Sequence, residues 1–112
     1  MNNFENQFDI IVKKHQNIEK SLSNQDNLDR NNLIKLNKEY SELTPVVKSI
    51  NQYNSVKKDI ENLNSLLNDK DISIRKMAED ELIEKNKKIK SLEQDLLNFL
   101  FQKILMMKKI LF

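Results

Sequence analysis

The feature that most constrains this chain is the complete absence of glycine from its 112 residues, together with a single proline. Glycine supplies the positive φ angles and the close backbone approach that tight turns and phosphate-cradling loops require. A Rossmann or P-loop nucleotide site is therefore excluded. Strand signals are absent as well, because runs of β-branched residues are short. We expect an all-α fold.

Composition also removes most enzyme classes. The chain has no cysteine and one histidine, which excludes a thiol nucleophile, a disulfide framework and a zinc cluster. The first residues carry acids such as Glu5 and Asp9, where a secretory signal would have a basic stretch before an apolar run. No stretch is long and apolar enough to span a bilayer. We expect a cytoplasmic protein.

The net charge of +2 comes from the last residues of the chain. Lys103, Lys108 and Lys109 lie in a stretch without acids, and without them 16 basic side chains face 17 acidic ones. A nucleic-acid-binding protein would carry a basic patch in its body. The composition does not favour such a function.

Apolar residues at alternating steps of four and three predict three helices, at about residues 4–24, 29–68 and 71–100. Asp29 and Asp71 stand where the N-caps of the second and third helices belong. Pro45 should kink or briefly break the second helix, because it lacks a backbone donor and disfavours the α region for Thr44. The expected seam comprises Phe4, Phe8, Ile11, His15, Ile18 and Leu22, then Leu33, Leu36, Tyr40, Leu43, Val47, Ile50, Val56, Ile60, Leu63 and Leu67, then Ile74, Ala78, Leu82, Ile89, Leu92, Leu96 and Phe99.

These apolar stripes predict an elongated antiparallel helical hairpin, with a shorter N-terminal helix packed against it as in a coiled coil. The seam slips around Tyr53, and Lys85 interrupts it with a polar side chain. Residues 1–100 would form one domain. Residues 101–112 would be a tail of a different kind.

Each candidate functional site can also be explained as an ordinary structural feature of a helix. His15 could be a ligand or a general base, but it lies on the apolar stripe and has no Cys, second His or placed carboxylate as a partner. The acids Glu79, Asp80, Glu81 and Glu84 could bind a divalent cation, but without a glycine-containing loop they fit a solvated helix face. We therefore expect no catalytic residue, no cofactor-binding residue and no metal ligand, and hence no enzyme activity and no cofactor.

Several segments carry a family resemblance. The stretch Leu36–Val47 resembles the pattern L-S-K-E-Y-x-x-L-x-P-V-V, and Arg75–Leu82 resembles R-E-M-A-x-x-E-L. Upstream, Lys14–Ile18 is similar to an R-Y/H-E-E-L/V segment. All three patterns resemble the amino-terminal part of a family of class I peptide chain release factors. Members of this family occur in bacteria and organelles and act at UAA and UAG. The resemblance runs from about Phe8 to Leu100.

The resemblance implies a helical domain that lies near the ribosomal stalk base, helps to position the factor and meets the GTPase that recycles it. It also implies that codon recognition and the Gly-Gly-Gln loop belong to later domains, which this chain lacks. We therefore expect no direct codon reading by the chain and no peptide release by it alone.

The tail suggests a shifted reading frame. After Leu100 the family continues with P-K-D-P-N-D-E-K-N-I-I-L-E, which the present residues do not resemble. Written in AT-rich codons and read one nucleotide later, that stretch spells the eleven residues Gln102–Phe112 and then a stop codon. We therefore expect residues 101–112 to be out of frame. The alternative is a genuine amphipathic helix end.

Two other functions remain open at this point. A stand-alone coiled-coil adaptor would turn its heptads toward a partner chain instead of packing them internally. Membrane association would use Leu100–Phe112 as a cationic amphipathic tail, although we expect no membrane partner. The sequence does not determine the oligomeric state.

Overall fold

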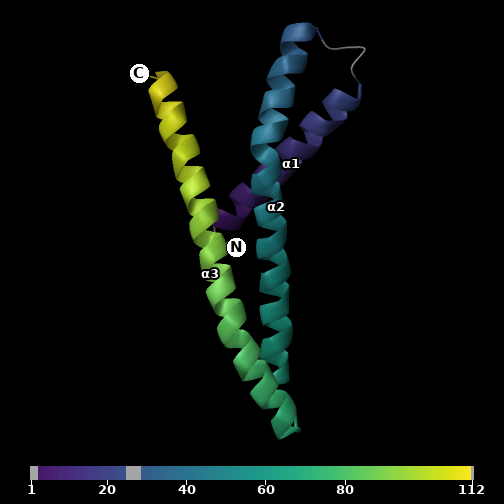
Figure 1. Cartoon of the computed structure of the whole chain (residues 1–112), viewed down its shortest axis with the longest axis vertical. Coiled ribbons are helices and arrows are strands. Elements are labelled where there is room, and N and C mark those ends of the chain that lie inside the picture. Colours follow the sequence, from purple (N-terminus) through teal and green to yellow (C-terminus); the bar gives the residue numbers. More distant parts are fainter. Residues whose placement is uncertain (1–2, 25–28, 112) are drawn as a thin grey trace. The chain divides into compact units, whose positions relative to one another are not determined.

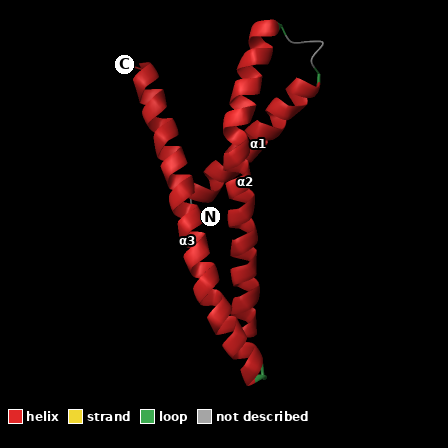
Figure 2. Cartoon of the chain, in the orientation of Figure 1, coloured by secondary structure: helices red, strands yellow, loops and turns green. Residues whose placement is uncertain are grey.

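The computed structural model describes the backbone of residues 3–24 and 29–111, and the side chains of residues 5–24 and 29–102. The described residues form three α-helices and contain no strand (Figure 2). They are α1 (Asn3–Ser23), α2 (Arg30–Leu66) and α3 (Ile72–Leu111). None of these residues has a positive φ angle, which agrees with the lack of glycine in the chain. The all-α prediction is confirmed.

The chain divides into two compact units, residues 1–50 and 51–112. In the first unit, α1 lies against the first part of α2 (Figure 1), and the side chains of Phe8, Ile18, Leu43, Val46 and Ile50 are buried. Burying such side chains is the main source of helix stability in a protein, since short helices are marginal in water.

In the second unit, the rest of α2 and α3 form an antiparallel hairpin across the short turn at residues 67–71 (Figure 1). Two cross-helix pairs show the direction, because Tyr53 contacts Glu93 and the later residue Asp59 contacts the earlier Lys85. The buried apolar side chains of this unit are Tyr53, Val56, Ala78, Leu82, Leu92 and Leu96.

The predicted heptad seam agrees closely with the observed burial. Every seam residue whose side chain is described is buried or half-buried. The side chain of Phe4 lies outside the described residues. Two buried residues were not predicted, Val46 at 7% exposure and Tyr53 at 4%. Val46 precedes the seam residue Val47, and Tyr53 marks the position where the seam slips.

Both predicted N-caps are confirmed. The Asp29 carboxylate accepts a hydrogen bond from the backbone N–H of Asn32 at 2.7 Å, and the Asp71 carboxylate accepts one from Ser73 at 2.8 Å. Each bond satisfies a backbone donor that the first turn of a helix leaves without a partner. The Asp69 carboxylate in turn accepts a bond from the Asp71 N–H at 2.9 Å, which orders the turn between α2 and α3.

The helix limits differ from the expected ones in two places. Of the two effects expected of Pro45, the break does not occur, because α2 is helical from Arg30 to Leu66, and the kink stays a prediction. Proline removes only one backbone bond, and the flanking Leu43 and Val46 are buried, which holds the helix together there. The third helix was expected to end near residue 100, but α3 continues to Leu111.

Candidate functional site

His15 lies on α1 and contacts α2. Its Nε2 atom is 3.0 Å from Thr44 Oγ1, and its ring stacks on Tyr40 with 4.4 Å between ring centroids and 14° between planes. The Thr44 hydroxyl also donates to the Tyr40 carbonyl oxygen at 2.7 Å. Because a hydroxyl has only one hydrogen, His15 Nε2 must be the donor in its bond to Thr44. The contact therefore fixes which ring nitrogen carries a proton.

A second cross-helix contact lies beside the first. Lys14 Nζ is 2.6 Å from Glu39 Oε1, and the two side chains are 53% and 27% exposed. An ion pair this open to solvent contributes no more than about 1 kcal/mol. We call Lys14, His15, Glu39, Tyr40 and Thr44 the α1 clamp, because together they join the middle of α1 to α2.

The α1 clamp explains why a polar histidine stands in an apolar seam. A general base needs a carboxylate or another group to orient it and a substrate proton within reach. His15 instead donates to a hydroxyl and covers an aromatic ring. In this structure it packs against α2 and hydrogen-bonds to it.

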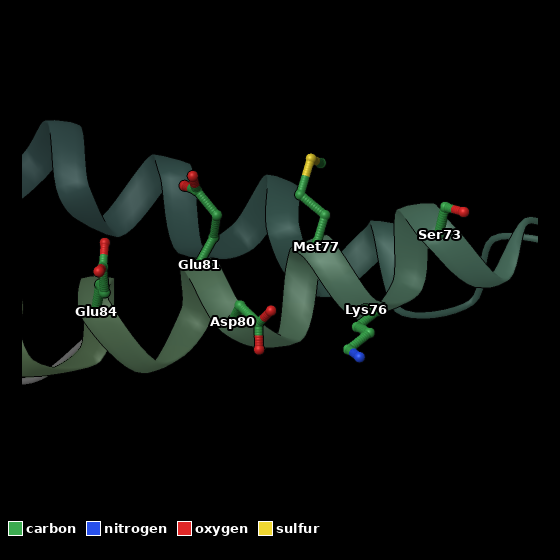
Figure 3. A pocket seen from close by; sticks show the side chains of 6 residues that line it. All are labelled: Ser73, Lys76, Met77, Asp80, Glu81 and Glu84. Atoms are coloured by element: carbon green, nitrogen blue, oxygen red, sulfur yellow. The ribbon is translucent and has the colours of Figure 1, made fainter.

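Three of the four candidate acids, Asp80, Glu81 and Glu84, line an open depression of about 540 Å³ together with Ser73, Lys76 and Met77, and Glu79 does not line it. Figure 3 shows Lys76 and Asp80 projecting to one side of the helix, while Met77 and Glu81 project to the other. All the lining residues belong to α3 alone. Among the described residues, no three acidic, His or Cys side chains stand close enough together to hold a metal ion.

Two polar pairs join α2 to α3 in the second unit, and the sequence did not predict either of them. The Tyr53 hydroxyl donates to Glu93 Oε1 at 3.4 Å. Burial raises the pKa of the Tyr53 hydroxyl above its ordinary value, and the charge of Glu93 adds to the rise. Lys85, the polar interruption of the seam, lies 3.2 Å from Asp59 Oδ2. Only the slip around Tyr53 and the unusual position of Lys85 could have indicated these contacts.

Within the part of the chain that the structure describes, no helix is both long enough and apolar enough to cross a bilayer. The side chains of residues 103–112, on which the amphipathic-tail hypothesis depends, lie outside the described residues.

Comparison with known proteins identifies the family. Residues 11–109 match the PCRF domain, and this segment covers most of the 112 residues. The chain belongs to the PCRF domain family. The match includes all five residues of the α1 clamp and the whole hairpin turn. It also extends into the tail, as far as residue 109.

Curated relatives of this PCRF domain are named peptide chain release factor 1. The protein from Wolbachia pipientis is 36% identical over 85 residues, which are 74% of this chain and 23% of the relative. The protein from Buchnera aphidicola is 38% identical over 94 residues, 83% of this chain and 26% of the relative. The chain thus spans about a quarter of the length of these relatives. No solved structure matches it.

Two of the three segments that carried the family resemblance meet in the structure. Lys14–Ile18 and Leu36–Val47 supply the two sides of the α1 clamp. Arg75–Leu82 forms the early part of α3, where Ala78 and Leu82 are buried in the hairpin. In this PCRF domain the resembling residues are therefore mainly those that pack the helices together.

Proposed function

We propose that this chain is the amino-terminal helical domain of a release factor 1-type protein and that it serves translation termination. The observation that carries the proposal is the PCRF match over residues 11–109. The named relatives, at 30–38% identity, point the same way. Because the chain covers about a quarter of each of those relatives, the activity of the whole factor belongs to the proposal.

The packing favours a domain over a stand-alone coiled-coil adaptor. An adaptor would keep its heptad residues free for a partner chain. Here the seam residues whose side chains the structure describes are buried or half-buried within a single chain. The Lys14–Glu39 and Lys85–Asp59 pairs also lie across neighbouring helices of the same chain.

The proposal includes a division of labour within the factor. This helical domain positions the protein on the ribosome, near the stalk base, and meets the GTPase that recycles the factor in the cytoplasm. Codon recognition and hydrolysis of peptidyl-tRNA need other parts of the factor. His15 donates to the Thr44 hydroxyl, whose own hydrogen goes to the Tyr40 carbonyl oxygen, so the histidine is not placed to take a proton from that hydroxyl. We expect the purified chain to release no peptide at a stop codon.

The proposal also covers the end of the chain. We propose that residues 1–100 form the domain and that residues 101–112 are out of frame, a boundary that lies before the end of the PCRF match at residue 109. The test is to sequence the genomic DNA from the codon for Leu96 to a few hundred bases downstream. A single frame correction should open a long frame that encodes Gly-Gly-Gln. The absence of any such frame would contradict the frameshift.

The experiment that tests the function is co-sedimentation of the purified chain with bacterial ribosomes that present UAA in the decoding site. The chain should sediment with the ribosomes, and full-length release factor 1 should displace it. A helical hairpin of unrelated sequence and similar charge is the control. Recovery of the chain no higher than that of the control would contradict the proposed ribosome contact.

A further inference from the structure

Pro45 leaves a weak turn inside α2. The proline ring has no N–H, so the carbonyl oxygen of Ser41 lacks the donor that a helix supplies four residues later. The helix nevertheless continues on both sides, from Arg30 to Leu66. Sharp bends in helices occur mostly at positions of this kind.

A threonine weakens the same turn. The Thr44 hydroxyl donates to the Tyr40 carbonyl oxygen at 2.7 Å, and the helix backbone uses the same acceptor. A bond of this kind from a side chain to its own helix slightly destabilises the helix and often bends it. The carbonyl groups of two successive residues, Tyr40 and Ser41, thus depart from the regular helical pattern. We call residues 40–45 the proline joint.

The proline joint has a preferred direction of bending. Ser41 and Pro45 share one face of α2, and both are exposed. Tyr40 and Leu43 lie on the other side, where Leu43 is buried. Because the proline ring clashes with the carbonyl group of the preceding turn, a helix bends away from the side of its proline. A bend at the joint would therefore close toward the side of Tyr40 and Leu43.

The α1 clamp holds α1 against the proline joint. His15 donates to Thr44 Oγ1 at 3.0 Å and stacks on Tyr40, so it contacts both residues of the weakened turn. Lys14 pairs with Glu39, the residue just before the joint. The clamp thus places α1 on the side toward which α2 would bend.

The helix α1 also extends past the proline joint. Six residues separate α1 from α2, and the two helices run in opposite directions (Figure 1). The residues of α1 that precede His15 therefore lie beside the part of α2 that follows Pro45, where Val46 and Ile50 are buried. Because α1 lies along both sides of the joint, it opposes a bend toward itself.

We propose that α1 is a splint that keeps α2 from bending at the proline joint. While the α1 clamp is closed, α2 keeps one direction through residues 40–45. When the clamp opens, the joint bends away from the Pro45 side. Because α2 belongs to both units, such a bend changes the direction in which it leaves the first unit. This control of α2 by α1 does not depend on a release-factor function.

The contacts that close the splint are open to water. Thr44 is exposed, and the Lys14 side chain is 53% exposed. Contacts that water can replace open more readily than a buried core does. The clamp is therefore the part of the contact between α1 and α2 that substitutions can open while Ile18 and Leu43 stay buried.

Two spin labels on the Pro45 side of α2 report the bend. The chain has no cysteine, so Ile34→Cys and Gln52→Cys introduce the only labelling sites. Both positions are exposed and lie on the face of Pro45, roughly 27 Å apart along the helix. A bend of about 20° away from that face separates labels that stand about 10 Å from the helix axis by roughly 3 Å more. Double electron–electron resonance measures the distribution of this distance.

Variants of the clamp test the splint. His15→Ala with Lys14→Glu removes the hydrogen bond and the ring stack and turns the ion pair with Glu39 into a repulsion. The distance between the labels should become longer by roughly 3 Å, and its distribution should become wider. The matched control is Gln16→Ala with Lys13→Glu, which makes the same change of charge at exposed neighbours outside the clamp. The control should leave the distribution unchanged.

Pro45→Ala tests the joint itself, because alanine supplies the missing N–H and has no ring. In the clamp-open variant it should restore the narrow distribution. In the chain with an intact clamp it should change little, because the splint already holds α2. Circular dichroism checks that each variant stays helical. His15→Ala alone keeps the ion pair, should give a smaller shift in the same direction, and replaces the double variant if the latter loses helix signal.

Four results would overturn the splint. They are a wide distribution while the clamp is intact, no change when the clamp is opened, an equal change in the matched control, and a change that Pro45→Ala does not reverse. The last of these would mean that α2 gives way somewhere other than at the proline joint.

Discussion

The α1 clamp supports a quantitative prediction about how α1 is held on α2. His15→Ala removes both the hydrogen bond to Thr44 and the stack on Tyr40. A hydrogen bond of this kind contributes about 1 kcal/mol, and an aromatic stack about 0.5–1.5 kcal/mol. His15 is half-buried, so water replaces part of each contribution. We expect the free energy of unfolding to fall by about 1.5 kcal/mol.

A double-mutant cycle separates the hydrogen bond from the stack. Thr44→Val removes the hydroxyl but keeps the shape of the side chain, and it should cost about 1 kcal/mol. The hydrogen bond can be lost only once, so the double variant should lose less stability than the sum of the two single losses, by about 0.5–1 kcal/mol. Urea unfolding followed by far-ultraviolet circular dichroism measures all four free energies.

A variant next to His15 is the control for this prediction. Gln16→Ala, at the exposed residue next to His15, should change stability by less than about 0.5 kcal/mol. Strict additivity of His15→Ala and Thr44→Val would show that the two side chains do not interact. The account of a histidine held in an apolar seam by α2 would then be wrong.

Three further predictions concern the second unit. Leu96→Ala, at a side chain 2% exposed, should cost about 2–4 kcal/mol in urea unfolding, whereas Leu97→Ala, at 47% exposure, should cost less than about 1 kcal/mol. Equal costs would contradict the different burial of these two side chains. Because burial raises the pKa of Tyr53 in the folded state above 10.0, its contribution to stability is complete below pH 10.0 and is lost as the pH rises through the folded-state pKa. The stability of the Tyr53→Phe variant should not show that loss at high pH. If stability falls in parallel with pH for the variant and the unchanged chain, the prediction is refuted. Asp71→Ala removes the cap of α3 and should lower stability by about 1 kcal/mol, a loss that Asp71→Asn should largely avoid.

The sequence predicted the packing well because the signal for it is periodic and local. Leu43, Ile50 and Leu96 were placed in the seam by their spacing alone, and all three are almost fully buried. The N-caps were predictable for the same reason, since Asp29 and Asp71 act on residues two or three positions away.

The partners of polar residues could not be predicted, because they depend on how the helices are paired. His15 meets Thr44 across 29 positions of sequence, and Tyr53 meets Glu93 across 40. Of the kink or break expected at Pro45, the break does not occur, for a related reason. Local preference favours a break there, but burial of Leu43 and Val46 on either side outweighs it.

The central claim is that this chain is a release-factor domain, and a chimera tests it most directly. Residues 11–100 replace the matching segment of release factor 1 from Buchnera aphidicola, and peptide release at UAA is measured with purified ribosomes. A second chimera carries an unrelated helical hairpin of equal length. The account predicts release within about tenfold of the intact factor for the first chimera, and much slower release for the second. Release by the first chimera no faster than by the second would contradict the claim.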